Sequence, residues 1–167
     1  MERVNIVVIG DVPPVEVEIL RNELEKVFSY DFSVYARLPL PEECLMESRG
    51  QYDATCLLNR IMQYPGYRVL GVVSSDISFP GYNFLLGLAA SGGRGALISV
   101  YRLRHGDRKR YLERMKKEAM HELGHTFGLK HCNNRCVMQF SNTVFDVDNK
   151  PPAFCEECSI KIREHLR

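Results

Sequence analysis

Residues 121–131 read His-Glu-Leu-Gly-His-Thr-Phe-Gly-Leu-Lys-His. The rest of the fold has to hold these side chains in place. The stretch matches the pattern H-E-x-x-H-x-x-G-x-x-H at every specified position. An unrelated sequence does so by accident about once in roughly three million windows. Three of the chain's five histidines lie in this motif. The motif therefore indicates a metal site, and the rest of the chain can be interpreted outward from it.

The spacing of the first two histidines suits one face of an α-helix. His121 and His125 are four residues apart, which places them about 6 Å apart along a helix axis. Two imidazoles in this arrangement can bind one Zn²⁺ at about 2.0–2.1 Å each. Glu122 lies one residue further round the helix, where it can reach a water molecule on the metal without being a ligand.

The third histidine needs a break in the helix. In a continuous helix His131 would lie about 240° round the axis from His125. Gly128 tolerates the left-handed conformation that ends a helix, so the chain can turn there and bring His131 back to the metal. Three neutral histidines and one water make an open site, the type that catalytic zinc occupies.

Four cysteines predict a second metal site. Cys132, Cys136, Cys155 and Cys158 have the spacing C-x₃-C and C-x₂-C, which in a chain with no visible secretion signal favours metal over disulfides. Four thiolates form a closed structural zinc site, so we expect two zinc ions per chain. Cys132 follows His131 directly, so the structural zinc would also hold that ligand in place. Cys132 as the third catalytic ligand is disfavoured because the four-thiol site needs it.

The remaining cysteines carry no visible partner. Cys44 and Cys56 are expected to stand alone, as small buried hydrophobic residues.

Composition describes an ordinary globular protein. The chain has 167 residues, 45% hydrophobic and 26% charged, with a net charge of +1. This predicts a single domain over 1–167, divided into a sheet-and-helix part (1–128) and a zinc-stapled part (129–167). The charge predicts neither a nucleic-acid partner nor a membrane partner. We expect a cytoplasmic monomer, made without a leader or an inhibitory pro-segment.

Hydrophobic periodicity predicts alternating strands and helices. Strands are predicted at residues 3–10, 32–38, 68–73 and 96–103, with a further strand inside 79–90. Helices are predicted over 13–28, 54–63, 107–128 and 154–166. Asp11 and Asp107 are expected to cap the first and third helices. The predicted fold class is α/β (α+β), a mixed sheet with helices packed on it.

These residues resemble the metzincin metallopeptidases, and within them the archaemetzincin family. The resemblance rests on the motif His121–His131 and on the cysteine pattern with Met138 at the position of a Met-turn. Residues 70–76 and 83–87 are also similar, so it covers most of the chain. The resemblance implies a compact catalytic domain with a horizontal cleft, a catalytic zinc on three histidines and a structural zinc on four cysteines.

Two positions depart from that family. The first cysteine pair, Cys132 and Cys136, is one residue closer than in the family pattern. Metzincins that use a tyrosine as a fifth ligand carry it two residues after the methionine, where this chain has Phe140. A phenylalanine can neither coordinate a metal nor donate a hydrogen bond. Oxyanion stabilisation would then come from the zinc or from another donor.

The sequence thus predicts a zinc metallopeptidase acting on peptides or proteins, with aminopeptidase activity as the narrower expectation. The zinc polarises the scissile carbonyl and lowers the pKa of its water toward 7, and Glu122 acts as the general base. Residues 97–103 are expected to be an edge strand that pairs with an extended peptide.

Two other functions remain open at this point. The spacing H-x₃-H-x₅-H also resembles small metal-dependent endoribonucleases, but these carry glycine where this chain has Glu122. A non-catalytic zinc module that binds a partner would not need that glutamate.

Overall fold

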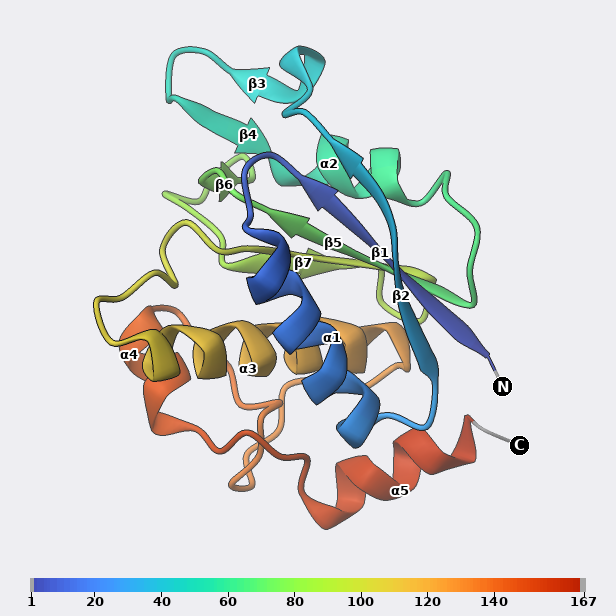
Figure 1. Cartoon of the computed structure of the whole chain (residues 1–167). Helices are drawn as coiled ribbons and strands as arrows, with labels where there is room; N and C mark the ends of the chain where they lie inside the picture. Colours follow the sequence, from blue (N-terminus) through green and yellow to red (C-terminus); the bar gives the residue numbers. More distant parts are fainter. Residues whose placement is uncertain (1, 166–167) are drawn as a thin grey trace.

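The predicted strands form a mixed five-stranded sheet in the computed structural model, which describes residues 2–165 (Figure 1). Its strand order is β2-β1-β5-β8-β7. The bounds are β1 Arg3–Ile9, β2 Asp31–Leu38, β5 Arg68–Val73, β7 Gly87–Ala89 and β8 Gly95–Ser99. Neighbouring strands are parallel except β7, which runs antiparallel to β8. The predicted fold class is confirmed.

Alternating side chains of β1 divide the core into two layers. Val4, Ile6 and Val8 pack with α1 (Pro14–Val27) and α3 (Arg108–Thr126) on one face. Val7 and Ile9 point the other way and pack with α2 (Ala54–Ile61). Figure 1 shows α1 and α3 on one side of the sheet and α2 on the other. The parallel strands β1, β5 and β8 are buried on both faces, which explains their continuous hydrophobic runs.

A second, three-stranded sheet holds the loop between β6 and β7 in place. It comprises β3 Leu45–Met46, β4 Gln51–Asp53 and β6 Ile77–Ser78, preceded by the 3₁₀ helix η1 (Glu42–Cys44). Arg49 donates to the carbonyl oxygens of Tyr82 and Asn83 at 2.7 and 2.9 Å. These hydrogen bonds to its backbone carbonyl groups hold the loop between β6 and β7 in place.

The C-terminal part packs against α3. It carries α4 (Val144–Asn149) and α5 (Glu156–Glu164). Arg114 on α3 binds both oxygens of Asp148 at 2.8 and 2.7 Å. Lys117 on α3 donates to the carbonyl oxygen of Val147 at 3.0 Å. These bonds hold α4 on the helix that carries the histidine motif.

Several element boundaries differ from the sequence prediction. Helix α1 begins after Pro13 with no side-chain cap, so Asp11 does not cap it. Asp107 does cap α3, accepting from the backbone N–H groups of Lys109 and Arg110. Helix α2 ends at Ile61. Residue 166, the predicted end of the last helix, lies outside the described residues.

The predicted edge strand is wrong. Residues 100–103 form a turn, in which Leu103 N–H donates to the Val100 carbonyl at 3.1 Å, so β8 stops at Ser99. Strand β8 also lies between β5 and β7, inside the sheet. The edge strand beside β8 is β7, only three residues long, within the segment where a further strand was predicted, and β2 forms the other edge.

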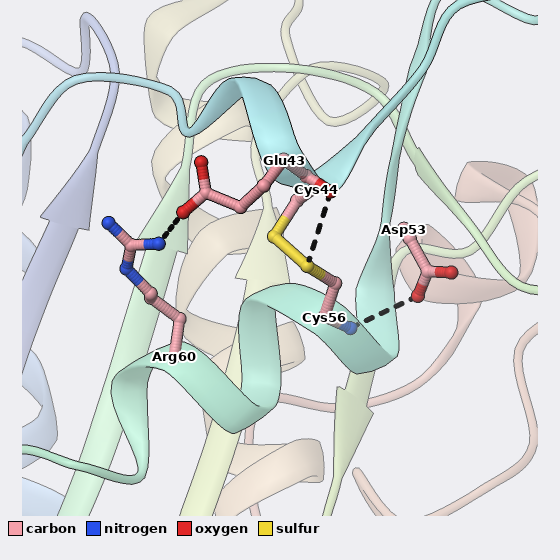
Figure 2. Close-up of a disulfide and its surroundings, with 5 residues drawn as sticks. All are labelled: Glu43, Cys44, Asp53, Cys56 and Arg60. Atoms are coloured by element: carbon pink, nitrogen blue, oxygen red, sulfur yellow. Dashed lines mark hydrogen bonds and ion pairs between the residues drawn. A yellow bond between two sulfur atoms is a disulfide. The ribbon is translucent and has the colours of Figure 1, made fainter.

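The expectation for Cys44 and Cys56 is also wrong, because the two form a disulfide (Figure 2). Cys44 ends η1 and Cys56 lies in the first turn of α2, with their Cα atoms 5.5 Å apart. Asp53 caps α2 by accepting from the Cys56 N–H, and Glu43 forms an ion pair with Arg60. The β3–β4 hairpin folds the intervening chain back on itself and so brings the two cysteines together. The spacing of the cysteines in the sequence does not show this hairpin.

Within residues 2–165, no helix is both long enough and apolar enough to cross a bilayer.

Candidate metal centre

Helix α3 ends where the histidine motif requires it to end. Gly128 has φ of 84°, in the left-handed region. Its N–H donates to the His125 carbonyl at 3.0 Å, and Leu129 N–H donates to the Gly124 carbonyl at 3.2 Å. This pair of bonds is a Schellman motif, which satisfies the last carbonyls of a helix and reverses the chain. The predicted turn at Gly128 is confirmed.

The turn brings the three histidines together. One ring nitrogen from each of His121, His125 and His131 lies within 4.8 Å of the others. The Nε2 atoms of His121 and His125 are 3.2 Å apart. Their Nδ1 atoms lie 2.9 and 2.8 Å from the carbonyl oxygens of Val137 and Leu129, which orients both rings as donors on that side. The Nε2 lone pairs are thereby left for a metal ion, so this donor set fits zinc.

Burial keeps these imidazoles in the form that binds metal. Burial, with a contribution from the nearby Lys150 ammonium, lowers the pKa of His121 to about 3. Burial likewise lowers the pKa of His125 and of His131 below the usual value. All three rings are therefore neutral near pH 7, and only a neutral imidazole nitrogen can donate its lone pair.

Glu122 lies at the same centre, buried beneath the edge strand. Its carboxylate lines a pocket of about 570 Å³ together with the three histidines. It makes no hydrogen bond or ion pair with any described residue, and its Oε2 lies close to Gly87 of β7, which also lines the pocket. Burial, then the neighbouring Glu118, raises its pKa, against the Lys150 ammonium. A bound divalent cation favours the ionised form that a general base requires.

Two residues near this centre were not predicted. Lys150 is 2% exposed, and its Nζ lies 3.2 Å from His121 Nδ1 and donates to the Gln139 carbonyl at 3.2 Å. Glu118 lines the pocket one helical turn before Glu122. The spacing of Glu118 on the helix could have indicated it. No sequence signal relates Lys150 to His121, since they meet only through the packing of α4.

The four cysteines also come together. The sulfurs of Cys132, Cys136, Cys155 and Cys158 all lie within 4.8 Å of one another. Cys132 Sγ and Cys155 Sγ are 3.8 Å apart, about the ~3.8 Å that two thiolates at ~2.3 Å from a tetrahedral zinc require. The shorter first cysteine pair therefore does not prevent the cluster, and the donor set fits a structural zinc.

Backbone contacts join the cysteine cluster to the histidine cluster. Cys132 N–H donates to the Met138 carbonyl at 3.0 Å, and the neighbouring Val137 carbonyl orients His121. Met138 is fully buried against Gly124 of α3, where a Cβ atom would come within 2.5 Å of its sulfur. Residues 132–138 thus connect one set of ligands to the other.

The pocket beside the histidines is lined by the edge strand β7 and by the ring of Phe140. All three residues of β7 line the pocket, and among the described residues the outer edge of β7 has no partner strand. The Phe140 ring lies 5.1 Å from the His131 ring, centre to centre, in an edge-on arrangement. A phenylalanine side chain has no atom that could serve as a ligand or a hydrogen-bond donor there.

Comparison with known proteins agrees with this geometry. The model of Peptidase family M54 matches residues 12–164. The archaemetzincin of Archaeoglobus fulgidus is 48% identical over 148 residues, which cover 88% of this chain and 91% of the relative.

Solved structures show the same fold. The crystal structure of that archaemetzincin, complexed with malonate, has a TM-score of 0.90 at 45% identity and covers 95% of this chain and 99% of its own. A zinc-dependent peptidase from Methanocorpusculum labreanum has a TM-score of 0.81 at 26% identity, with the same coverage. The chain therefore belongs to peptidase family M54, the archaemetzincins, and is a zinc metallopeptidase.

Proposed function

We propose that this enzyme cleaves peptides in the pocket beneath β7, with His121, His125 and His131 as ligands of a catalytic zinc and Glu122 as the general base. One observation carries the proposal. Three imidazole nitrogens within 4.8 Å of one another share a pocket with a buried carboxylate that has no partner of its own. That combination suits hydrolysis by an activated water.

Substrate binding is assigned to the edge strand. The free edge of β7 offers backbone N–H and C=O groups to an extended peptide, which would add a strand to the sheet. Gly87 lies in that strand directly above Glu122, so a peptide paired there passes over the carboxylate. This replaces the expectation that residues 97–103 bind the peptide.

The zinc ion and Glu122 would have different roles in hydrolysis of the peptide bond. When bound, zinc polarises the scissile carbonyl and lowers the pKa of water to about 7. Glu122 takes the proton of the attacking water and passes it to the leaving amine. Val137 and Leu129 hold the histidine rings in place through their carbonyl oxygens during both steps.

The finer substrate preference is part of the same proposal. Glu118 lines the pocket one helical turn from Glu122; burial raises the pKa of its acid group, and the nearby Lys150 ammonium acts in the opposite direction. A carboxylate is the group that binds the ammonium of a free peptide N-terminus, which favours aminopeptidase activity.

We further propose a second, structural zinc on the four cysteines, and a cytoplasmic monomer. Four thiols available for metal are typical of a reducing compartment. The Cys44–Cys56 disulfide is unusual there, although intracellular proteins of hyperthermophiles do carry such bonds. The endoribonuclease and the non-catalytic zinc module are not favoured, because the family match is to a peptidase and Glu122 is present.

A peptide library, offered in paired free and N-acetylated copies, tests the proposed activity. We expect cleavage detected by mass spectrometry, lost on chelation and restored by zinc, with free N-termini preferred. Equal cleavage of acetylated copies would remove the aminopeptidase assignment alone. Absence of cleavage across the library would contradict the peptidase proposal.

Glycine at position 87 gives a second prediction. A Cβ atom there would lie 2.6 Å from Glu122 Oε2, 2.8 Å from Glu122 Cγ and 2.8 Å from the Leu97 carbonyl oxygen. We expect Gly87→Ala to displace the general base and lower kcat, since misplacement by about 1 Å can cost on the order of 10²-fold. Zinc content should stay unchanged.

Gly71→Ala provides the control for general crowding of the sheet. A Cβ atom at Gly71 would meet Ile61 and Leu97 side chains at 3.1–3.4 Å, on the sheet face opposite α3. The Gly71→Ala substitution should lower the free energy of unfolding but leave kcat unchanged. A Gly87→Ala enzyme with the wild-type kcat would show that this glycine does not position Glu122.

A further inference from the structure

Three aromatic rings are exposed around the catalytic pocket. Phe79, Tyr82 and Phe140 are 38%, 57% and 62% exposed, and all three line the pocket. We call them the aromatic rim. Large hydrophobic side chains exposed singly are common, whereas several around one concave site mark a binding surface.

The rim joins two segments distant in the sequence. Phe79 and Tyr82 come from the loop between β6 and β7, with ring centres 6.0 Å apart and edge-on. Phe140 follows the motif and has its ring against His131. A group bound against Phe140 is therefore beside a metal ligand, close to the bond that is cut.

The backbone that carries Phe79 and Tyr82 is fixed although their rings are exposed. The Tyr82 carbonyl accepts from Arg49 Nη2 at 2.7 Å and from Ser78 Oγ at 2.9 Å, and the Tyr82 N–H donates to the Phe79 carbonyl at 3.0 Å. The backbone that carries Phe79 and Tyr82 is thus in place before a ligand binds, which reduces the conformational entropy lost on binding.

We propose that the aromatic rim is the specificity subsite of the enzyme, and that it takes a bulky apolar side chain, aromatic or large aliphatic, next to the scissile bond. This rests on the proposed peptidase function. Such a side chain removes its own apolar surface and that of the rings from water, and aromatic pairs add edge-to-face attraction. Small or charged side chains gain neither.

The test compares a matched peptide pair that differs only by phenylalanine or alanine beside the bond that the library shows to be cut. We expect kcat/KM to favour the phenylalanine peptide by at least about tenfold. In Phe140→Ser and in Tyr82→Ser this ratio should fall toward one. The control is Phe145→Ser, because Phe145 is 70% exposed and lies outside the pocket lining. It should keep the wild-type ratio.

A binding measurement keeps this test independent of hydrolysis. Calorimetric titration of the zinc-loaded Glu122→Gln protein with the same pair, or with Phe-Ala-Ala and Ala-Ala-Ala peptides if nothing is cleaved, should show the same preference. The preference should disappear when Phe140→Ser is added and persist when Phe145→Ser is added. Equal affinities of the two peptides, or an unchanged preference in Phe140→Ser, would overturn the assignment. Failure of cleavage with the binding preference intact would contradict only the peptidase proposal.

Discussion

Replacing Glu122 by glutamine is expected to lower the rate of peptide hydrolysis by at least about 10²-fold, toward the 10²–10⁴-fold that loss of a general base typically costs. The amide is nearly the same size as the carboxylate but cannot accept a proton near pH 7. The three histidines and their carbonyl partners are untouched, so fold and zinc content should survive. Steady-state kinetics on a peptide from the library, with elemental analysis of the same sample, measures both.

Glu113→Gln is the matched control. Glu113 lies on the same helix, outside the catalytic pocket, and its half-exposed side chain forms an ion pair at 3.4 Å with the buried Lys117. The same chemical change there should leave the rate within a few-fold of wild type, because Glu113 lies outside the pocket that holds the three histidines and Glu122. A Glu122→Gln enzyme as active as Glu113→Gln would refute the proposed role of Glu122.

Replacing Cys155 by serine is expected to remove one of two zinc equivalents and to destabilise the fold. Three thiolates cannot close a tetrahedral site, so residues 132–158 lose the metal that would join their two cysteine pairs. A destabilisation of about 3 kcal/mol would lower the melting temperature by roughly 6–12 °C in a chain of this size. Activity should fall as well, since His131 adjoins Cys132. Elemental analysis, thermal unfolding and kinetics together measure this.

The double variant Cys44→Ser/Cys56→Ser separates the zinc cluster from a general effect of losing cysteines. It removes the disulfide on the far side of the sheet and should retain both zinc equivalents. If the Cys155→Ser protein kept the wild-type melting temperature and its full zinc content, the four cysteines would not be a zinc site.

Local chemistry was predicted from the sequence because it depends on residues close together in the chain. The helical spacing of His121 and His125 and the turn at Gly128 follow from backbone geometry over a few residues. The strand predicted at 68–73 has the bounds that were expected, because a parallel strand buried on both faces reads as one hydrophobic run.

Other features depended on how distant segments pack, and only the tertiary structure decided them. Lys150 reaches His121 because α4 docks on α3, and Cys44 meets Cys56 because a hairpin folds back between them. The edge of the sheet next to the histidine pocket is β7 rather than residues 97–103, since a strand's own residues do not show which neighbours it will have. The hydrophobic periodicity and the turn residues are local signals in the sequence. The strand order, the aromatic rim and the contacts between distant residues arise from long-range packing. The sequence by itself determined which residues could hold the metal, and the tertiary structure decided what surrounds them.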